Sequence, residues 1–219
     1  MRRHSLTMTT AVLAALTSGP VMAQQKPAGP DHMQHKFDPA TSAKSFDDPA
    51  RDAWQMPSRV IEALALRPGM SVADIGAGTG YFSMRLAAVS PQVTVFSADI
   101  EPAMVAHLKK RAADEGRANV VGVLAGETSP NLPKPVDVIL IANTYHHIGS
   151  RANYFKRLRQ SLTPSGRVAI VDFRKDAPDG PPVEFRFTVD QIVAEMTQAG
   201  FSLDATHQFL PRQNFLIFK

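Results

Sequence analysis

A short glycine-rich segment between an apolar run and a helix-like stretch constrains this sequence most. The segment reads Asp74-Ile75-Gly76-Ala77-Gly78-Thr79-Gly80, with glycine at every second position. Glycine allows a sharp turn with positive φ and lets a ligand approach the main chain, and the free N–H groups at the next helix start favour polar ligand groups. Because Asp74 adds a negative charge beside this turn, a ligand with a cationic end suits it better than a pyrophosphate. The sequence therefore predicts a nucleotide cradle between a strand and a helix.

Composition limits the classes of protein to consider. The chain has 219 residues, of which 44% are hydrophobic and 20% charged, which indicates one globular domain with a sizeable core. The net charge is +4, and it falls to +2 without Arg2 and Arg3, so no nucleic-acid-binding surface is indicated. With no cysteine in the chain, a disulfide framework and a thiolate nucleophile are excluded.

Residues 1–23 have the pattern of an export signal. Arg2 and Arg3 precede a short, weakly apolar core, and Val21-Met22-Ala23 forms a small-residue cleavage site. We expect cleavage after Ala23, a periplasmic protein and no stable membrane anchor; if the leader does not function, the protein is cytoplasmic. A fusion of residues 1–30 to a reporter active only outside the cytoplasm tests this expectation.

Residues 24–56 are predicted to form a linker that leads into an N-terminal arm or lid. The segment is rich in Pro, Asp, Gln and Ala and shows little periodicity. His32 and His35 have the spacing to share a helical face and bind a metal, but no third ligand stands at a suitable spacing, so a solvated linker is favoured. Trp54 either packs over a ligand cleft or anchors the arm.

From residue 57 to residue 219, helical and strand patterns alternate. Short apolar strands separated by helices are typical of a parallel sheet covered on both faces, and the fold class is therefore α/β, doubly wound and mostly parallel. The expected strands are 70–75, 93–98, 119–124, 136–142, 167–173, 201–210 and 213–218, and the expected helices are 58–66, 81–89, 102–115, 151–162 and 188–199.

The last two predicted strands have no helix between them and so depart from this alternation. Only Pro211 and Arg212 separate them, and only antiparallel neighbours can be joined so briefly. A seven-stranded sheet closed by a C-terminal antiparallel hairpin is not the topology of dinucleotide-binding dehydrogenases.

Functional groups in such sheets gather beyond the carboxyl ends of the strands. Asp99 lies 19 residues beyond Gly80, close to the spacing at which an acid meets a ribose diol, although it also suits a helix cap before Pro102. The expected rim consists of Gly76 to Gly80, Asp99 to Glu101, Gly126-Glu127, Asn143 to His147 and Asp172-Phe173-Arg174.

These motifs together resemble the class I S-adenosylmethionine-dependent methyltransferases, in their UbiE-like small-molecule branch. The resemblance covers about residues 57–219 and rests on Asp74 to Gly80, Asp99-Ile100-Glu101-Pro102, Asp137-Val138-Ile139-Leu140 and Leu162-Thr163-Pro164-Ser165-Gly166-Arg167-Val168. It implies S-adenosylmethionine as the methyl donor and a small-molecule acceptor.

The resemblance also implies roles for individual residues. Asp74 would lie near the methionine ammonium, with Gly76, Gly78 and Gly80 leaving room for the cofactor. Asp99, followed by Ile100, would accept hydrogen bonds from the ribose hydroxyls. Glu127 would stand near the adenine amino group, one methylene longer than the usual aspartate, and Asn143 would open the loop that faces the sulfonium.

Methyl transfer is an in-line displacement in which the protein contributes orientation, proximity and, for some acceptors, a base. His146 or His147 is a candidate base because histidine titrates near neutrality, and Tyr145 is a candidate for positioning the acceptor. The alternative is a packed loop with one structural histidine. Arg174, Glu184 and Arg186 either line the acceptor side or are surface charges.

Two other functions have to be weighed. An exported, non-catalytic binding protein on a methyltransferase scaffold would explain a leader that separates the chain from cytoplasmic S-adenosylmethionine. A nucleotide-dependent oxidoreductase is less favoured, because Tyr81 and Ser83 occupy the third glycine position in the two possible registers of its motif. The default acceptor is a small quinone-like or phenolic molecule. No motif indicates a resident metal, and no pattern indicates an oligomeric state.

Overall fold

The computed structural model describes residue 1 and residues 36–219. The predicted leader and the His32/His35 pair lie outside the described residues. The helices are α1 (Pro39–Phe46), α2 (Arg51–Gln55), α3 (Pro57–Ala63), α4 (Tyr81–Ala87), α5 (Pro102–Asp114), α6 (Arg151–Leu158) and α7 (Val189–Gln198). The strands are β1 (Ser71–Ile75), β2 (Thr94–Asp99), β3 (Val120–Leu124), β4 (Val136–Ala142), β5 (Leu162–Phe173), β6 (Leu203–His207) and β7 (Gln213–Phe218), and the 3-10 turns are η1 (Tyr145–His147), η2 (Arg159–Ser161) and η3 (Val183–Phe185).

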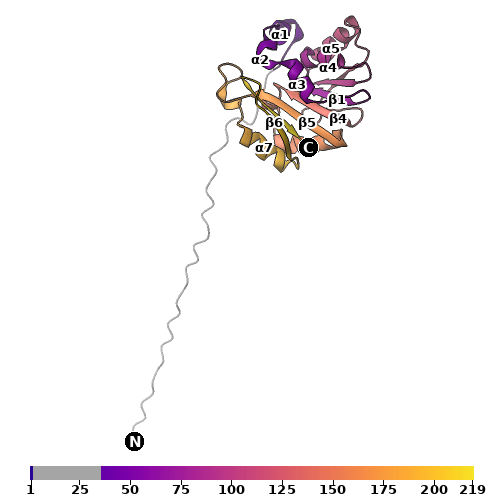
Figure 1. Cartoon of the computed structure of the whole chain (residues 1–219). Helices are drawn as coiled ribbons and strands as arrows, with labels where there is room; N and C mark the ends of the chain where they lie inside the picture. The colour runs from indigo at the N-terminus through magenta and orange to yellow at the C-terminus, as the bar shows by residue number, and fades with distance from the viewer. Residues whose placement is uncertain (2–35) are drawn as a thin grey trace.

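The strands form one seven-stranded sheet in the order β3-β2-β1-β4-β5-β7-β6 (Figure 1). The first five are parallel, whereas β7 pairs antiparallel with both β5 and β6. This arrangement confirms the predicted α/β fold and its C-terminal antiparallel hairpin. Its carboxyl edge brings the ends of β1, β2, β4 and β5 together, which is where ligands bind in sheets of this kind.

Alternate residues of the central strands face two separate cores. On one face, Ile139 and Ile141 of β4 pack in a cluster with residues of α6 and α7. On the other face, Val138 and Leu140 pack with residues of α3 and α4. Because both faces are covered, β4 reads as the nearly unbroken apolar run that the sequence shows.

Two strands differ from the predicted ones by more than one residue. β5 begins five residues early, because Leu162 already pairs with Val136 beyond an irregularity in the β4–β5 register. β6 is shorter than predicted because Phe201 is 4% exposed and belongs to the core cluster beside α7, while Leu210 is 1% exposed and packs into the other core. The side chains at both ends of the predicted strand therefore pack in the two hydrophobic cores, outside the paired part of β6.

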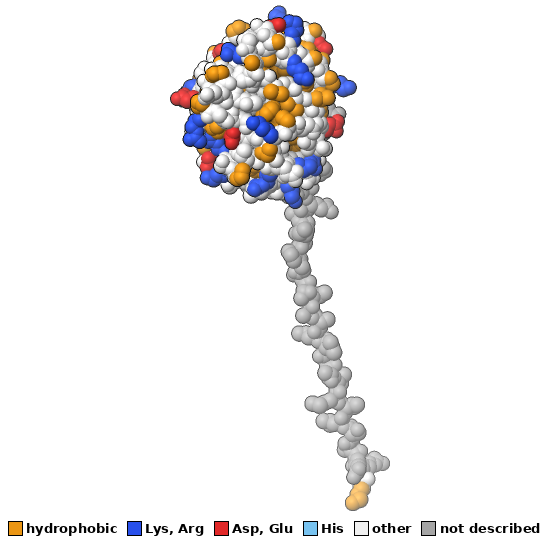
Figure 2. Space-filling model, turned by 90° about the vertical axis from the view of Figure 1, so that its right-hand side faces the viewer, with side chains coloured by type: hydrophobic (Ala, Val, Ile, Leu, Met, Phe, Trp, Pro, Cys, Tyr) orange, Lys and Arg blue, Asp and Glu red, His pale blue; other side chains and the backbone are white. Residues whose placement is uncertain are grey.

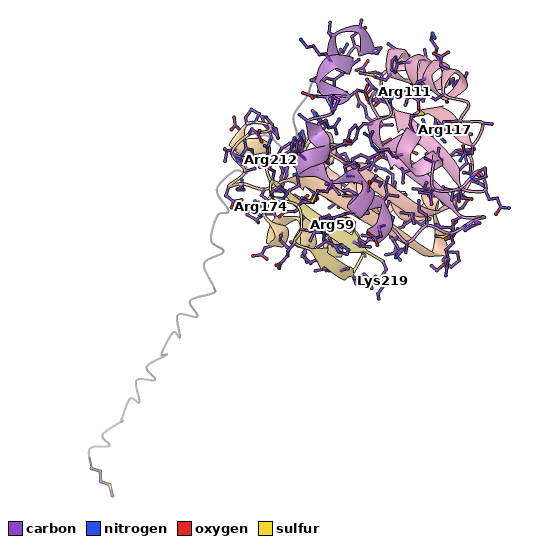
Figure 3. All side chains as sticks on the ribbon, turned by 45° about the horizontal axis from the view of Figure 1, so that its top comes forward. Arg59, Arg111, Arg117, Arg174, Arg212 and Lys219 are labelled. Carbon is purple, nitrogen blue, oxygen red and sulfur yellow. The ribbon has the colours of Figure 1, made fainter. Side chains whose placement is uncertain are left out.

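The segment before residue 57 packs against the rest of the fold through α1 and α2. Asp47 forms an ion pair of 2.8 Å with Arg111 of α5, which Figure 3 labels near the top of the molecule. Trp54 lies 5.6 Å from Phe173 between ring centroids, at the end of β5. Since Trp54 is not among the described residues that line the cavity, it anchors the arm.

The surface combines apolar and charged side chains. In the face shown in Figure 2, hydrophobic side chains lie among those of lysine and arginine, as is usual for a folded chain. Among the described residues, no helix has the length and apolar character needed to cross a membrane.

Candidate active site

A cavity of about 1000 Å³ lies at the carboxyl edge of the sheet. This volume is at the upper end of the range for small-molecule sites, enough for a nucleoside-sized ligand together with a second molecule. Its walls bring together most of the residues singled out in the sequence: Asp74, Gly76, Gly78, Asp99, Ile100, Glu127, Asn143, His146 and His147. Gly80 and Tyr145 are not among the described lining residues.

The glycine loop has the backbone that the sequence predicts. Gly76, Gly78 and Gly80 have φ values of +70°, +55° and +94°. A Cβ atom on Gly76 would lie 2.3 Å from the side chain of Thr144, so the loop after β4 approaches the glycine loop too closely for any other residue. A Cβ on Gly78 would lie 3.1 Å from the ring of Phe46, which places α1 directly over the loop.

Two buried carboxylates stand beside this loop. Asp74 is 3% exposed, and burial raises its pKa to about 6, although a hydrogen bond of 2.7 Å from the Ser83 hydroxyl works against that rise. Asp99 is 7% exposed and accepts the N–H groups of Gly78 and Glu101 at 2.8 and 2.9 Å, while burial raises its pKa. Buried acids of this kind suit a ligand that brings a cation to one carboxylate and hydroxyl donors to the other.

His146 stands on the opposite wall and is paired with an acid. Its Nδ1 lies 2.8 and 2.9 Å from the two carboxylate oxygens of Asp172, and its backbone N–H donates to the same carboxylate at 3.1 Å. An ionised carboxylate only accepts hydrogen bonds, so Nδ1 carries the proton and Nε2 is left as the acceptor. The sequence predicted that Asp172 lies at the carboxyl edge of the sheet, but no motif indicated its hydrogen bond with His146.

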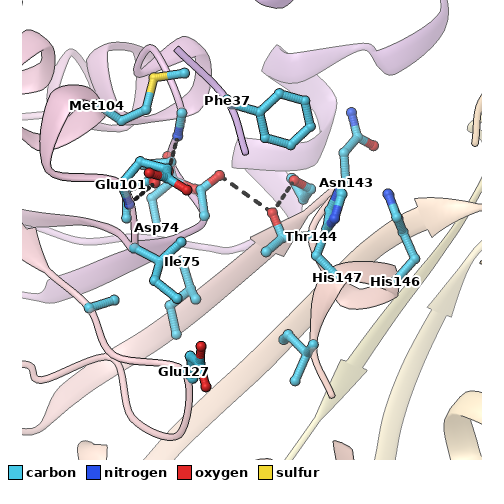
Figure 4. Close-up of a pocket in the computed structure, with 18 of the residues that line it drawn as sticks. Phe37, Asp74, Ile75, Glu101, Met104, Glu127, Asn143, Thr144, His146 and His147 are labelled. Atoms are coloured by element: carbon cyan, nitrogen blue, oxygen red, sulfur yellow. Dashed lines mark hydrogen bonds between the residues drawn. The ribbon is translucent and has the colours of Figure 1, made fainter. Parts of the chain in front are cut away.

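The histidine wall is aromatic. The rings of His146 and His147 are 4.2 Å apart, and Phe37 meets His147 edge-on at 5.5 Å. Phe37 in turn lies 5.2 Å from Phe46. Figure 4 shows Asp74 and Glu101 on the left of the cavity, the two histidines on the right and Phe37 above. A ligand between these walls therefore meets acids on one side and an aromatic surface on the other.

Tyr145 does not reach the cavity, contrary to the expectation that it positions an acceptor. It is 0% exposed, its hydroxyl donates to Glu195 of α7, and its ring packs on Phe155 and Phe187. The turn η1 sends Tyr145 into the core beneath α6 and α7 and leaves the next two residues to face the cavity.

Asn143 lines the cavity but also holds the arm. Its backbone has a φ of +55°. Its side-chain Oδ1 accepts hydrogen bonds from the side-chain amides of Gln55 and Gln213. Its amide nitrogen has no partner among the described residues and is the group it offers to a ligand.

The three charged residues for which an acceptor-side position and a surface position were both open lie outside the cavity. Arg174 pairs with Asp176 at 2.7 Å and lies beside Arg212 at one corner of the molecule (Figure 3). Arg186 is buried and donates to the carbonyls of Pro181 and Ala177, so it holds a loop in place. Glu184 is exposed and outside the cavity. Within residues 36–219, no group of three or more His, Cys, Asp or Glu side chains is placed to hold a metal ion.

Comparisons with known proteins agree with this geometry. The profile of the family described as "Methyltransferase domain" matches residues 73–168. An uncharacterized methyltransferase, GK2543, from Geobacillus kaustophilus is 25% identical over 76% of this chain and 85% of its own length. The crystal structure of an S-adenosylmethionine-dependent methyltransferase from Aquifex aeolicus superposes with a TM-score of 0.76 at 26% identity, covering 84% of this chain and 98% of that one.

These matches identify the protein as an S-adenosylmethionine-dependent methyltransferase. The methyltransferase is also 31% identical to the ubiquinone/menaquinone biosynthesis C-methyltransferase UbiE of Ectopseudomonas mendocina, over 52% of this chain but only 46% of that protein. Its methyl donor is S-adenosylmethionine. The residues present fit that cofactor, since Asp74 is a buried anion for an ammonium and Asp99 is an acceptor for ribose hydroxyls. Ile100, 49% exposed in the cavity wall, remains a predicted cofactor contact, and Glu127 remains a predicted contact of the adenine end.

Three features of the cavity escaped the sequence: the pairing of Asp172 with His146, the position of Phe37 and the position of Arg51. The first two arise from strand pairing and from the packing of the arm, neither of which a linear motif records. Arg51 of α2 also lines the cavity. Its segment carried no periodic signal, so only the fold shows where this charge lies.

Proposed function

We propose that this methyltransferase transfers the methyl group to a hydroxyl group of a small aromatic acceptor. The observation that carries the proposal is the buried His146–Asp172 pair on the cavity wall. A hydroxyl acceptor must lose its proton as the new bond forms, and a histidine held by a carboxylate is suited to remove it. When bound, S-adenosylmethionine supplies a methyl group on a positively charged sulfur that leaves as a neutral thioether.

The chain's own residues account for the rest of the reaction. Asp172 accepts from Nδ1, fixes the ring orientation of His146 and stabilises the imidazolium that forms when Nε2 takes the proton. His147 and Phe37 offer flat faces against which an aromatic acceptor can stack. The arm, with Phe46 over the glycine loop, limits the access of water to the site.

The names of related proteins support a small acceptor. Mouse acetylserotonin O-methyltransferase is 29% identical over 56% of this chain, although the match covers only 33% of the mouse protein. Its name describes methylation of an oxygen. A phenolic or similar hydroxyl is therefore the acceptor class we put forward.

The test is a transfer assay with methyl-tritiated S-adenosylmethionine and a panel of phenols, catechols, aromatic amines and carbon nucleophiles. We expect label in the products of the phenols or catechols. Label found only in amine or carbon products would refute the hydroxyl assignment. Tight cofactor binding without transfer to any acceptor would instead favour the non-catalytic binding protein.

A further inference from the structure

The methionine end of the cofactor carries an ammonium and a carboxylate, and the residues around the glycine loop provide a partner of opposite charge for only one of these two groups. Asp74 is a partner for the ammonium, whereas the carboxylate needs a cation. We propose that Arg51, on the arm helix α2, binds the methionine carboxylate of the cofactor, so that the arm is part of the cofactor site and not only a cover for it.

Arg51 and Asp74 face the same space. Both line the cavity, and the positive charge of Arg51 lowers the pKa of Asp74 against the larger effect of burial. Burial also lowers the pKa of Arg51 itself. A cation and an anion that interact across a cavity wall form the two-point pattern that an amino-acid group, with its ammonium and carboxylate, would bridge.

The guanidinium group is held in a fixed orientation. Its Nε and Nη2 donate to Oε1 of Gln55 at 3.0 and 2.6 Å, and its Nη1 donates to the carbonyl of Phe46. Its Cζ lies 3.8 Å from the centre of the Tyr81 ring, and Tyr81 is the residue that follows the glycine loop. A guanidinium has five N–H donors. Three are used here, and the described residues offer no acceptor for the remaining two.

The residue that orients Arg51 is itself fixed by the sheet. Gln55 is 0% exposed, and its amide nitrogen donates to Gln213 of β7 at 3.1 Å and to Asn143 at 3.3 Å. The position of Arg51 is therefore set by contacts with the ends of β4 and β7, the same edge that forms the cofactor site. A preorganised cation loses little freedom when it binds an anion.

The other cations on the cavity wall are less well placed. Arg157 donates to the carbonyl of Thr128, in the loop after β3 where Glu127 stands, at the predicted adenine end. Lys36 is exposed. Arg51, by contrast, lies against Tyr81, directly after the glycine loop.

The test compares two ligands that differ at the methionine end. S-adenosylhomocysteine has the ammonium and the carboxylate, whereas 5′-methylthioadenosine has the same nucleoside and sulfur but neither charge. Calorimetric titration of the full chain would be carried out for the wild type, Arg51→Gln, Arg51→Lys and Arg59→Gln. Arg59 is the matched control, because it is exposed on α3 and its guanidinium stacks on Phe209 outside the cavity (Figure 3).

We expect Arg51→Gln to weaken S-adenosylhomocysteine about 10- to 100-fold, the range for a charge-assisted hydrogen bond to a carboxylate. Methylthioadenosine should bind all four proteins within about threefold, and Arg51→Lys should recover part of the loss. An equal loss for both ligands, or no loss for either, would overturn the proposal. If the wild type bound neither ligand, the cofactor site itself would be misplaced, which is a separate failure.

Discussion

Replacement of His146 by alanine is expected to lower kcat for methyl transfer by roughly 100- to 10,000-fold, the usual contribution of a general base. Affinity for S-adenosylmethionine should change only slightly, because His146 is not among the residues proposed to contact the cofactor. The loss should be largest for weakly acidic alcohols and smallest for phenols that ionise unaided. Steady-state rates over acceptors of graded acidity, together with calorimetric titration of the cofactor, measure the two effects.

Two further variants define the role of His146. Asp172→Asn keeps a polar partner but removes the carboxylate that stabilises the imidazolium, so kcat should fall by about 10-fold or more. Tyr145→Phe is the control, since its hydroxyl contacts Glu195 outside the cavity, and its kcat should match that of the wild type. A His146→Ala enzyme with a kcat within about threefold of the wild type for every acceptor would contradict the assignment of this base.

Replacement of Asp74 by asparagine is expected to make the protein more stable and nearly unable to bind its cofactor. Burial raises the pKa of Asp74 from 3.8 to about 6, so the ionised carboxylate that the site needs destabilises the folded state at neutral pH. Removing that charge should raise the free energy of unfolding by on the order of 2–3 kcal/mol above pH ~6, and the melting temperature by roughly 5 °C or more. Affinity for S-adenosylmethionine should fall by about 30-fold or more.

The sign of the pH dependence distinguishes this explanation from a general effect of mutation. A carboxyl whose pKa is higher in the folded state binds its proton more tightly there, so the stability it contributes is present below pH ~4 and is lost as the pH rises to ~6. The stability gain of Asp74→Asn should therefore be small near pH ~3.5 and complete above pH ~6.5. Thermal denaturation across this range checks it, with the exposed Asp114→Asn as control. An Asp74→Asn protein less stable than the wild type at pH ~8 would contradict the account.

The sequence predicted those elements whose patterns are local. β4 and β7 lie at their predicted bounds, because each is a short apolar run ended by a polar or helix-breaking residue. The turn of the glycine loop was predicted equally well, since alternating glycines after a buried strand indicate positive φ angles. The boundaries that shifted, at Leu162 and Phe201, depend on strand pairing and on a core side chain, which are tertiary effects.

The candidate site was predictable only in part for the same reason. Parallel strands bring their carboxyl ends to one edge, so Asp74, Asp99 and His146 could be expected to meet there. Adjacent positions in a three-residue turn face different directions, however, and the sequence did not reveal that Tyr145 points into the core while His146 lines the cavity. Arg51 and Phe37 reach the site through the packing of the arm, which leaves no linear signal.

The cavity beyond β1 and β2 is the site at which we expect S-adenosylmethionine to bind. Calorimetric titration of the full chain with S-adenosylhomocysteine at about pH 8, where Asp74 is ionised, tests it most directly. We expect one-to-one binding that is lost in Asp99→Ala, with the circular dichroism spectrum of the variant unchanged. No binding to the wild type, or equal binding to wild type and Asp99→Ala, would contradict the claim.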